Sequence, residues 1–158
     1  MNAIRTVEGD LGVGDLRIAL VASRFNQDVV DRLVKGAVEA LVAQGANPAG
    51  LELVRVPGAY DLPLIARRLA DSGRFDAIVA LGAVIRGETP HFDFVAGECA
   101  AGLARVAGET GVPVAFGVLT TENEEQAMAR AGGSEGNKGA DAALAAVELA
   151  NLLRKLGS

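Results

Sequence analysis

The apolar run at residues 78–84 constrains the fold of this chain most strongly. Every residue in the segment IVALGAV is apolar or glycine. A strand with one face in water alternates apolar and polar residues, whereas a strand buried on both faces is apolar throughout. Strands of the second kind occur in parallel sheets that helices cover on both sides. The run therefore predicts the central strand of an α/β fold.

Shorter strand and helix patterns alternate along the rest of the chain. Because parallel neighbours need long right-handed crossovers, the alternation favours a parallel sheet with helices on both faces. We predict an α/β fold of the flavodoxin-like class: a three-layer α/β/α sandwich around a four-stranded parallel sheet, with residues 1–14 as an N-terminal arm or an edge strand. Strands are expected at residues 16–23, 51–56, 78–84 and 114–119, and helices at 27–44, 62–70, 92–109, 121–131 and 137–156.

Polar residues mark the expected helix starts. Asn26 or Asp28 is suited to cap the first helix, because side-chain oxygens there accept hydrogen bonds from the first turn. Thr120 or Thr121 would cap the short fourth helix, with the acidic and glutamine residues that follow forming a capping box. Asn137 would open the last helix after a glycine-rich break.

Length and composition limit the class of protein. A chain of 158 residues fits a single domain, 1–158, that buries a sizeable core. Half of the residues are hydrophobic while only 4% are aromatic, so small apolar side chains supply the excess. More of them than one core needs indicates surface buried between subunits of a homo-oligomer. The net charge of −5 argues against nucleic acid as a partner.

Cysteine and histidine are too scarce for a typical metal site. The chain has one of each, Cys99 and His91, so we expect no intrachain disulfide and no zinc cluster. The first residues are polar, without an apolar signal region, and no apolar run reaches the length of a membrane span. We therefore expect a cytoplasmic location and no membrane partner.

Unusual residues gather where each predicted strand ends, and in a parallel sheet these loops converge on one edge. The first strand is followed by Phe25 and Asn26, and the second by a turn that leads to Asp61. After the central strand, residues 86–90 form a Gly/Thr turn that feeds a helix beginning near His91. Backbone N–H groups at such a junction suit a phosphate, and an imidazole beside it suits proton transfer.

Each of these residues also has an ordinary structural interpretation. A lone histidine is more often structural than catalytic, Phe25 is able to serve as a hydrophobic plug, and Asp61 as a helix cap. Arg130 and Lys138 flank the glycine-rich break and would normally be solvated charges. Alternatively, the nearby Asp141 would hold Arg130 in one orientation for a phosphate.

Five segments in register resemble the lumazine synthase family: RFN at 24–26, VPGAYDLP at 56–63, ALGAVIRGETPHFDFV at 80–95, FGVLTTENEEQA at 116–127 and RAGGSEGNKGADAA at 130–143. The resemblance implies condensation of 5-amino-6-(D-ribitylamino)pyrimidine-2,4-dione with 3,4-dihydroxy-2-butanone 4-phosphate to 6,7-dimethyl-8-ribityllumazine and phosphate, in riboflavin biosynthesis. No cofactor or metal is implied. It also implies pentamers, some of which close into icosahedral capsids, with sites shared between subunits.

The resemblance carries roles to matching positions. Phe25 would stack on the pyrimidine, Asn26 and the backbone near Ala59 and Tyr60 would bind its edge and side chain, Asp61 the ribityl hydroxyls, and Val84 and Ile85 would line the ring pocket. Gly87, Glu88 and Thr89 would hold the phosphate, His91 would move protons, and Phe116, Arg130 and Lys138 would come from the neighbouring subunit, with Arg130 on the phosphate.

Two departures and two rival interpretations qualify these roles. Asp61 stands where glutamate is more usual, and Glu88 puts a carboxylate beside the proposed phosphate turn. One rival is a lumazine- or riboflavin-binding or shell-forming paralogue with secondary catalysis, although such a binder needs neither His91 nor Arg130. The other is a flavin or nucleotide phosphate carrier, which the lack of an aromatic pair disfavours.

Overall fold

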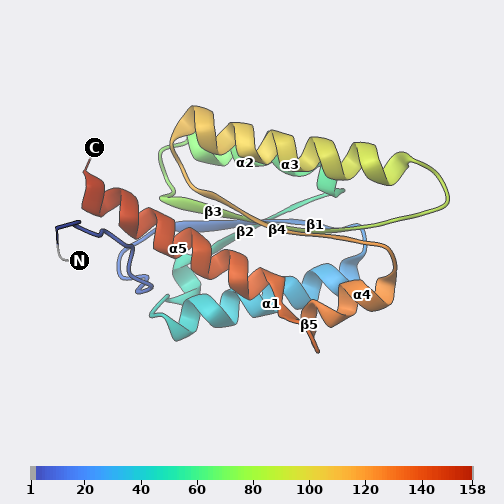
Figure 1. The fold of residues 1–158 in the computed structure, drawn as a ribbon, viewed down its shortest axis with the longest axis horizontal. Coiled ribbons are helices and arrows are strands. Elements are labelled where there is room, and N and C mark those ends of the chain that lie inside the picture. Colours follow the sequence, from blue (N-terminus) through green and yellow to red (C-terminus); the bar gives the residue numbers. More distant parts are fainter. Residues whose placement is uncertain (1–2, 158) are drawn as a thin grey trace.

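The computed structural model describes residues 3–157 and contains the predicted central sheet (Figure 1). Four parallel strands lie in the order β2-β1-β3-β4. The connection from β1 to β2 therefore runs toward one edge of the sheet, and the connections to β3 and then β4 run toward the other edge. The predicted α/β fold with a four-stranded parallel sheet is therefore confirmed. The strands are β1 (Ile18–Ser23), β2 (Glu52–Val56), β3 (Ala77–Ile85) and β4 (Val114–Thr121).

Helices cover both faces of this sheet, as Figure 1 shows: α2 and α3 lie on one side, and α1 and α5 on the other. The helices are α1 (Gln27–Ala43), α2 (Leu62–Asp71), α3 (His91–Thr110), the short α4 (Glu124–Ala129) and α5 (Lys138–Leu156). Two single turns of 3-10 helix, η1 (Pro48–Gly50) and η2 (Ala59–Asp61), precede β2 and α2.

The position of strand β3 between two layers of helices explains why its sequence is apolar throughout. Val79 and Leu81 point into the cluster shared with α1 and α5, whereas Ile78 and Ala80 point into the cluster shared with α2 and α3. All four are inaccessible to solvent. Full burial of a large aliphatic side chain stabilises by roughly 1.5–3 kcal/mol. The strand thus holds the two halves of the core together and fixes where its carboxyl end lies.

The fourth helix begins later than predicted. Thr120 and Thr121 do not cap it, because they extend β4 and pair with the last two residues of β3. Asn123 is the cap, and its Oδ1 accepts a hydrogen bond of 2.8 Å from the Gln126 N–H. The side-chain oxygen of Gln126 accepts in turn from the Glu122 N–H. The capping pattern was therefore present, but it begins at Asn123, closer to the helix than either threonine would place it.

The glycine-rich break after α4 forms a small hairpin that was not predicted. Strands β5 (Ala131–Gly133) and β6 (Gly136–Asn137) pair in antiparallel fashion. Gly132 and Gly136 adopt φ angles of 99° and 84°, a conformation that favours glycine. Asn137 then caps α5 as predicted, since its Oδ1 accepts from the Ala140 N–H at 3.0 Å. Strands this short carry no readable alternation of apolar residues.

The residues before β1 form an arm rather than an edge strand, since residues 3–14 contain no strand. The Asn151 side chain donates to the carbonyl oxygens of Asp10 and Gly12 at 2.8 and 2.9 Å. Lys155 Nζ donates to the Glu8 carbonyl at 2.8 Å. These contacts hold the arm along the last turns of α5, at the end of the molecule opposite the β3–α3 turn (Figure 1).

Candidate active site

The loops after β1 and β2 are joined where these strands end. The N–H of Arg24 donates to the Val56 carbonyl at 2.8 Å, and that of Phe25 to the Pro57 carbonyl at 3.0 Å. Phe25 nevertheless remains 72% exposed. A large ring that its own chain leaves in solvent at a strand end is not a hydrophobic plug of this chain. It is placed to stack on a planar ligand or to pack against another subunit.

Asn26 has an unusual backbone at the same edge. It is the one non-glycine residue among residues 3–157 with a positive φ, 62°. Its side chain does not cap α1. Instead Nδ2 donates to the Ala83 carbonyl at 3.0 Å, which ties the end of β1 to the end of β3. Such a conformation persists only where surrounding contacts hold it, and it concentrates at functional sites. The other end of the amide, Oδ1, accepts no hydrogen bond from any described residue.

The Asp61 carboxylate is engaged in its own turn. Its Oδ2 accepts a hydrogen bond of 3.0 Å from the Gly58 N–H and so stabilises η2. The interpretation of Asp61 as a cap for the helix that follows it is therefore wrong, because its side chain makes no cap hydrogen bond with α2 and caps η2 instead. In the same turn Ala59 is buried and Tyr60 is 61% exposed. This hydrogen bond fixes the carboxylate at the carboxyl edge and leaves Oδ1 without a bond to any described residue.

The turn between β3 and α3 presents unpaired backbone groups. Val84 is buried and Ile85 half-buried at the end of the strand, whereas Gly87, Glu88 and Thr89 are exposed. Within residues 3–157, the N–H groups of positions 87–89 donate no hydrogen bond. His91 is the first residue of the 20-residue helix α3 and is exposed. A run of unpaired N–H groups before a helix N-terminus is an arrangement that binds anions.

A second group of predicted residues gathers at the outer edge of β4. A hollow of about 340 Å³ lies there, and Phe116, Arg130 and Lys138 share its wall. The other residues that line it are Val118, Leu119, Thr120 and Thr121. Nothing from the first group lines this hollow. The structure thus brings the predicted residues together in two groups, one at the ends of β2, β1 and β3 and one beside β4.

Hydrogen bonds to backbone carbonyls fix the Arg130 side chain and the main chain of Lys138. Arg130 Nη1 donates to the Gln126 carbonyl at 3.1 Å, and the Lys138 N–H donates to the Arg130 carbonyl at 2.9 Å. Asp141 makes no hydrogen bond or ion pair with Arg130, so that expectation was wrong. Among the described residues, neither side chain has an acidic partner. Sequence analysis missed the role of Gln126, although its place in the capping pattern was visible.

Comparison with known proteins identifies the family. The family model described as 6,7-dimethyl-8-ribityllumazine synthase matches residues 15–154. A protein of that name from Nitratidesulfovibrio vulgaris strain DP4 is 52% identical over 156 residues, covering 99% of this chain and 100% of the relative. One from Chlorobium phaeovibrioides strain DSM 265 / 1930 is 52% identical over 153 residues, covering 97% and 99%.

The chain belongs to the 6,7-dimethyl-8-ribityllumazine synthase family. The predicted family is confirmed, and with it the prediction of an enzyme of riboflavin biosynthesis. This membership also makes the carboxyl edge of the sheet, where the family's motifs lie, the natural place to look for the site.

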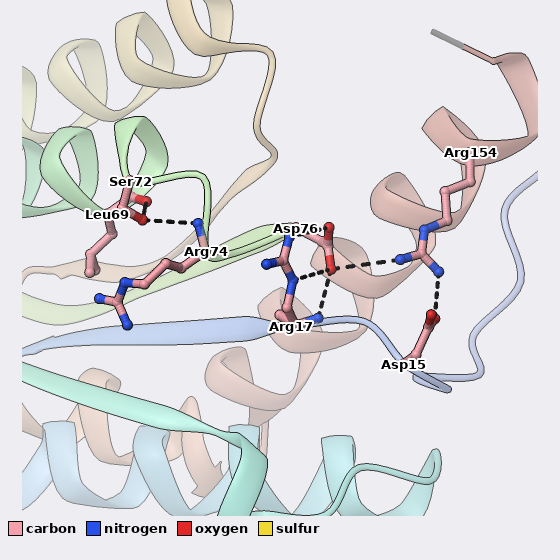
Figure 2. Close-up of polar contacts among 7 residues, drawn as sticks. All are labelled: Asp15, Arg17, Leu69, Ser72, Arg74, Asp76 and Arg154. Atoms are coloured by element: carbon pink, nitrogen blue, oxygen red, sulfur yellow. Dashed lines mark hydrogen bonds and ion pairs between the residues drawn. The ribbon is translucent and has the colours of Figure 1, made fainter.

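The amino end of the sheet holds a larger hollow whose charged residues are paired. About 580 Å³ lies between the segments that enter β3 and β4 and the last turns of α5. Its charged residues bind one another: Asp76 accepts from Arg17 and lies 3.7 Å from Arg154, which is 2.7 Å from Asp15 (Figure 2). Paired charges of this kind offer no surplus charge to a ligand. Size alone would therefore select the end of this lumazine synthase family member that lies away from the family's motifs.

Cys99 lies in the middle of α3 and is buried. Burial raises the pKa of its thiol to about 11, because removal from water disfavours the thiolate. No group of three or more metal-ligating side chains occurs within residues 3–157. In the same part of the chain, none of the helices has the length and apolar character needed to cross a membrane.

Proposed function

We propose that this chain condenses 5-amino-6-(D-ribitylamino)pyrimidine-2,4-dione with 3,4-dihydroxy-2-butanone 4-phosphate, releasing phosphate and forming 6,7-dimethyl-8-ribityllumazine. Family membership supports the reaction. The observation that carries the site is the exposed turn at 87–89, whose N–H groups are unpaired and stand next to the single histidine. A phosphate binder and a proton carrier side by side match a reaction that eliminates phosphate.

The loops after β1 and β2, with the end of β3, would bind the pyrimidine. Phe25 is exposed enough to stack on its ring, and the Asn26 side chain, held by Ala83, is able to present Oδ1 to a ring N–H. The ribityl chain would run along η2, where one Asp61 oxygen has no hydrogen-bond partner among residues 3–157. Ala59, Tyr60, Val84 and Ile85 complete this half of the proposed site.

The phosphate would lie at the turn after β3. Gly87, Glu88 and Thr89 would donate backbone N–H groups, and the Thr89 hydroxyl would add another donor. Arg130, which has no acidic partner among the described residues, would supply the positive charge. Glu88 is compatible with this role because only its N–H needs to face the phosphate.

The proposed mechanism needs no protein nucleophile. The substrate amine attacks the ketone to give an imine and water, phosphate leaves by elimination, and ring closure with loss of a second water gives the lumazine. His91 would carry protons between these steps, since imidazole is the side chain most often used as a general acid and base. The rest of the rate enhancement would come from holding two substrates together. Cys99 takes no part, because it is buried and protonated at neutral pH.

We propose further that each site forms between two subunits of a homopentamer, either as a free ring or as part of an icosahedral capsid. Two groups of site residues on separate flanks of one chain support this idea, because a heterologous ring joins one flank to the other flank of the next copy. Phe116, Arg130 and Lys138 would then complete the neighbour's site. We propose a cytoplasmic location, in keeping with a lone buried thiol.

Mixing both substrates with the purified protein and recording lumazine absorbance tests the reaction. We expect rapid appearance of the product with stoichiometric release of phosphate. The uncatalysed rate, measured without protein, is the control. A protein that binds the finished lumazine but forms it no faster than that control would be a binding or shell-forming paralogue, and the proposed activity would be wrong.

A further inference from the structure

Arg86 holds the junction where β3 and β4 end. Its N–H donates to the Thr121 carbonyl at 2.8 Å, which extends the ladder between the two strands by one bond. Its side-chain Nε donates to Glu122 Oε2 at 2.6 Å, in the residue that follows β4. Main chain and side chain of one residue therefore attach the start of the 86–90 turn to the β4–α4 connection.

The same guanidinium also reaches the first turn of α3. Its Cζ lies 4.4 Å from the centroid of the Phe92 ring, and its Nη2 lies 3.5 Å from Asp93 Oδ1. A guanidinium that stacks on an aromatic face and meets two carboxylates is held in one orientation. Phe92 and Asp93 directly follow His91 in the chain. Arg86 thus contacts the segments on both sides of the residues proposed to bind phosphate and move protons.

Charge gives Arg86 a second effect on the turn. Glu122 and Asp93 both bind the residue that begins the 86–90 turn, and both would lose this counter-ion if Arg86 were absent. Uncompensated negative charge beside this turn disfavours an incoming dianion. Arg86 itself is committed to these two carboxylates and the Phe92 ring, which distinguishes it from Arg130, whose guanidinium has no acidic partner among residues 3–157.

We propose that Arg86 is a positioning residue for the reaction: with Glu122 as its anchor, it fixes the 86–90 turn and the first turn of α3 in the geometry that phosphate binding and proton transfer require. The inference rests on the proposed function of this turn. It assigns Arg86 no contact with either substrate, so its effect is expected through Gly87, Thr89 and His91.

The chain provides a matched control in Arg67. This arginine of α2 also donates to two carboxylates, Asp71 at 2.9 Å and Glu109 at 2.6 Å, but it lies away from the strand ends. We would compare Arg86→Gln with Arg67→Gln in the assembled protein, measuring kcat, KM for each substrate and Tm. We expect Arg86→Gln to lower kcat/KM for the phosphorylated ketone by about tenfold or more, since small misplacements of catalytic groups have effects of this size.

The two variants separate positioning from stability. We expect equal, small changes in Tm for both, no change in kinetics for Arg67→Gln, and an unchanged KM for the pyrimidine in Arg86→Gln. Kinetic constants for Arg86→Gln that match those of Arg67→Gln would overturn the proposal. Should Arg86→Gln fail to assemble, Glu122→Gln serves instead, because its amide oxygen still accepts one weaker bond; we expect a smaller loss in the same direction, and no loss would overturn the proposal.

Arg86→Lys distinguishes geometry from charge alone. An ammonium keeps the positive charge but lacks the planar fork that joins Glu122, Asp93 and the Phe92 ring. We expect this variant to remain impaired in kcat. Full recovery of kcat with lysine would show that charge alone is sufficient and would overturn the positioning role.

The single histidine allows a readout that does not depend on activity. With histidine labelled at its Cε1 carbon, one NMR signal reports on His91 in the full-length protein. We expect inorganic phosphate to shift this signal in wild type and in Arg67→Gln, and to do so only at higher concentration in Arg86→Gln. An identical phosphate titration in all three would count against the proposal, whereas a wild type that makes no lumazine would refute the proposed function.

Discussion

The charged residues at the two ends of helix α5 differ in whether they have partners of opposite charge, and the same difference separates the hollows at the two ends of the sheet. Near the last turn, Arg154 binds Asp15 and lies close to Asp76, which also accepts from Arg17 (Figure 2). At the first turn, Lys138 shares a hollow with Arg130, and neither has an acidic partner among residues 3–157. The charged side chains around the hollow at the amino end bind one another within the chain, whereas Arg130 and Lys138 beside β4 stay available to a ligand.

The two hollows also show that the size of a hollow and its charge can point to different ends of the sheet. The larger hollow lies at the amino end, where the ion pairs leave no net charge for a ligand. The smaller one, at the carboxyl end, contains two cations without an acidic partner in the described part of the chain and lies on the flank of an edge strand. A site for an anionic substrate is expected where cations lack partners, so the smaller hollow is the better candidate. Substitutions at the two ends should therefore differ in kind: loss of activity at one, loss of stability at the other.

The largest effect is expected at the carboxyl end, from His91→Ala. Removal of a general acid–base group typically costs roughly 10²–10⁴ in rate. Because parts of this condensation proceed without a catalyst, we expect a value toward the lower limit. Single-turnover rates at saturating substrates measure it directly. A rate equal to that of wild type would remove His91 from the mechanism.

Arg130→Ala should act on one substrate only. Hydrogen bonds to charged groups contribute about 1.5–3 kcal/mol, so we expect affinity for the phosphorylated ketone to fall by roughly 10- to 100-fold. Affinity for the pyrimidine should stay near that of wild type. Calorimetry with each ligand in turn, with the oligomeric state checked beforehand, separates the two. Equal losses for both ligands would indicate damage to folding or assembly instead.

At the amino end, Asp76→Ala should affect stability alone. The carboxylate accepts from the Arg17 backbone and side chain and is 24% exposed. Losing it leaves its donors without their charged acceptor, and we expect the free energy of unfolding to fall by about 1–3 kcal/mol. The kcat of the assembled variant should match that of wild type. A fall in kcat without loss of stability would contradict the division between the two ends.

The smallest effect concerns acid sensitivity at the same end. The pKa of Asp15 is lowered from 3.8, mainly because Arg154 donates a hydrogen bond to its carboxylate. A carboxyl group with a lower pKa in the folded state stabilises the protein above its unfolded pKa, and this contribution is lost as the pH falls through the folded value. The stability difference between wild type and Asp15→Asn should therefore be constant near neutral pH and shrink below about pH 4. Because Asp15 is exposed, high salt should also reduce it.

Much of this fold was predictable because the strongest signals were long. The uninterrupted apolar run of β3 predicted a doubly covered strand, and the structure buries it on both faces. Asn137 before a long apolar helix predicted its start correctly. The hairpin β5–β6 was missed because strands of two or three residues carry no pattern. The cap at Asn123 was missed because two threonines, which extend β4, stood nearby in the sequence.

The individual residues of the candidate site were predictable from the sequence, but the side-chain contacts between them were not. Strand-end positions were enough to bring Phe25, Asn26 and the 86–91 turn to one edge. Sequence order does not reveal which partner a charged side chain chooses. Asp141 was one of two alternatives for Arg130, which instead binds the Gln126 carbonyl, and the contacts of Arg86 with Glu122 and Asp93 were not expected at all. Such contacts depend on how loops from different strands meet in space.

The most direct test of a site shared between subunits mixes two damaged chains. His91→Ala and Arg130→Ala would be unfolded, combined in equal amounts and refolded, with mixing confirmed by mass spectrometry. In a heterologous ring each interface receives an intact His91 side and an intact Arg130 side with a joint probability of about one quarter. We predict recovery of about a quarter of wild-type activity at subsaturating phosphorylated ketone. Activity no higher than the average of the two separate variants would show that each chain builds its site alone and would contradict this account.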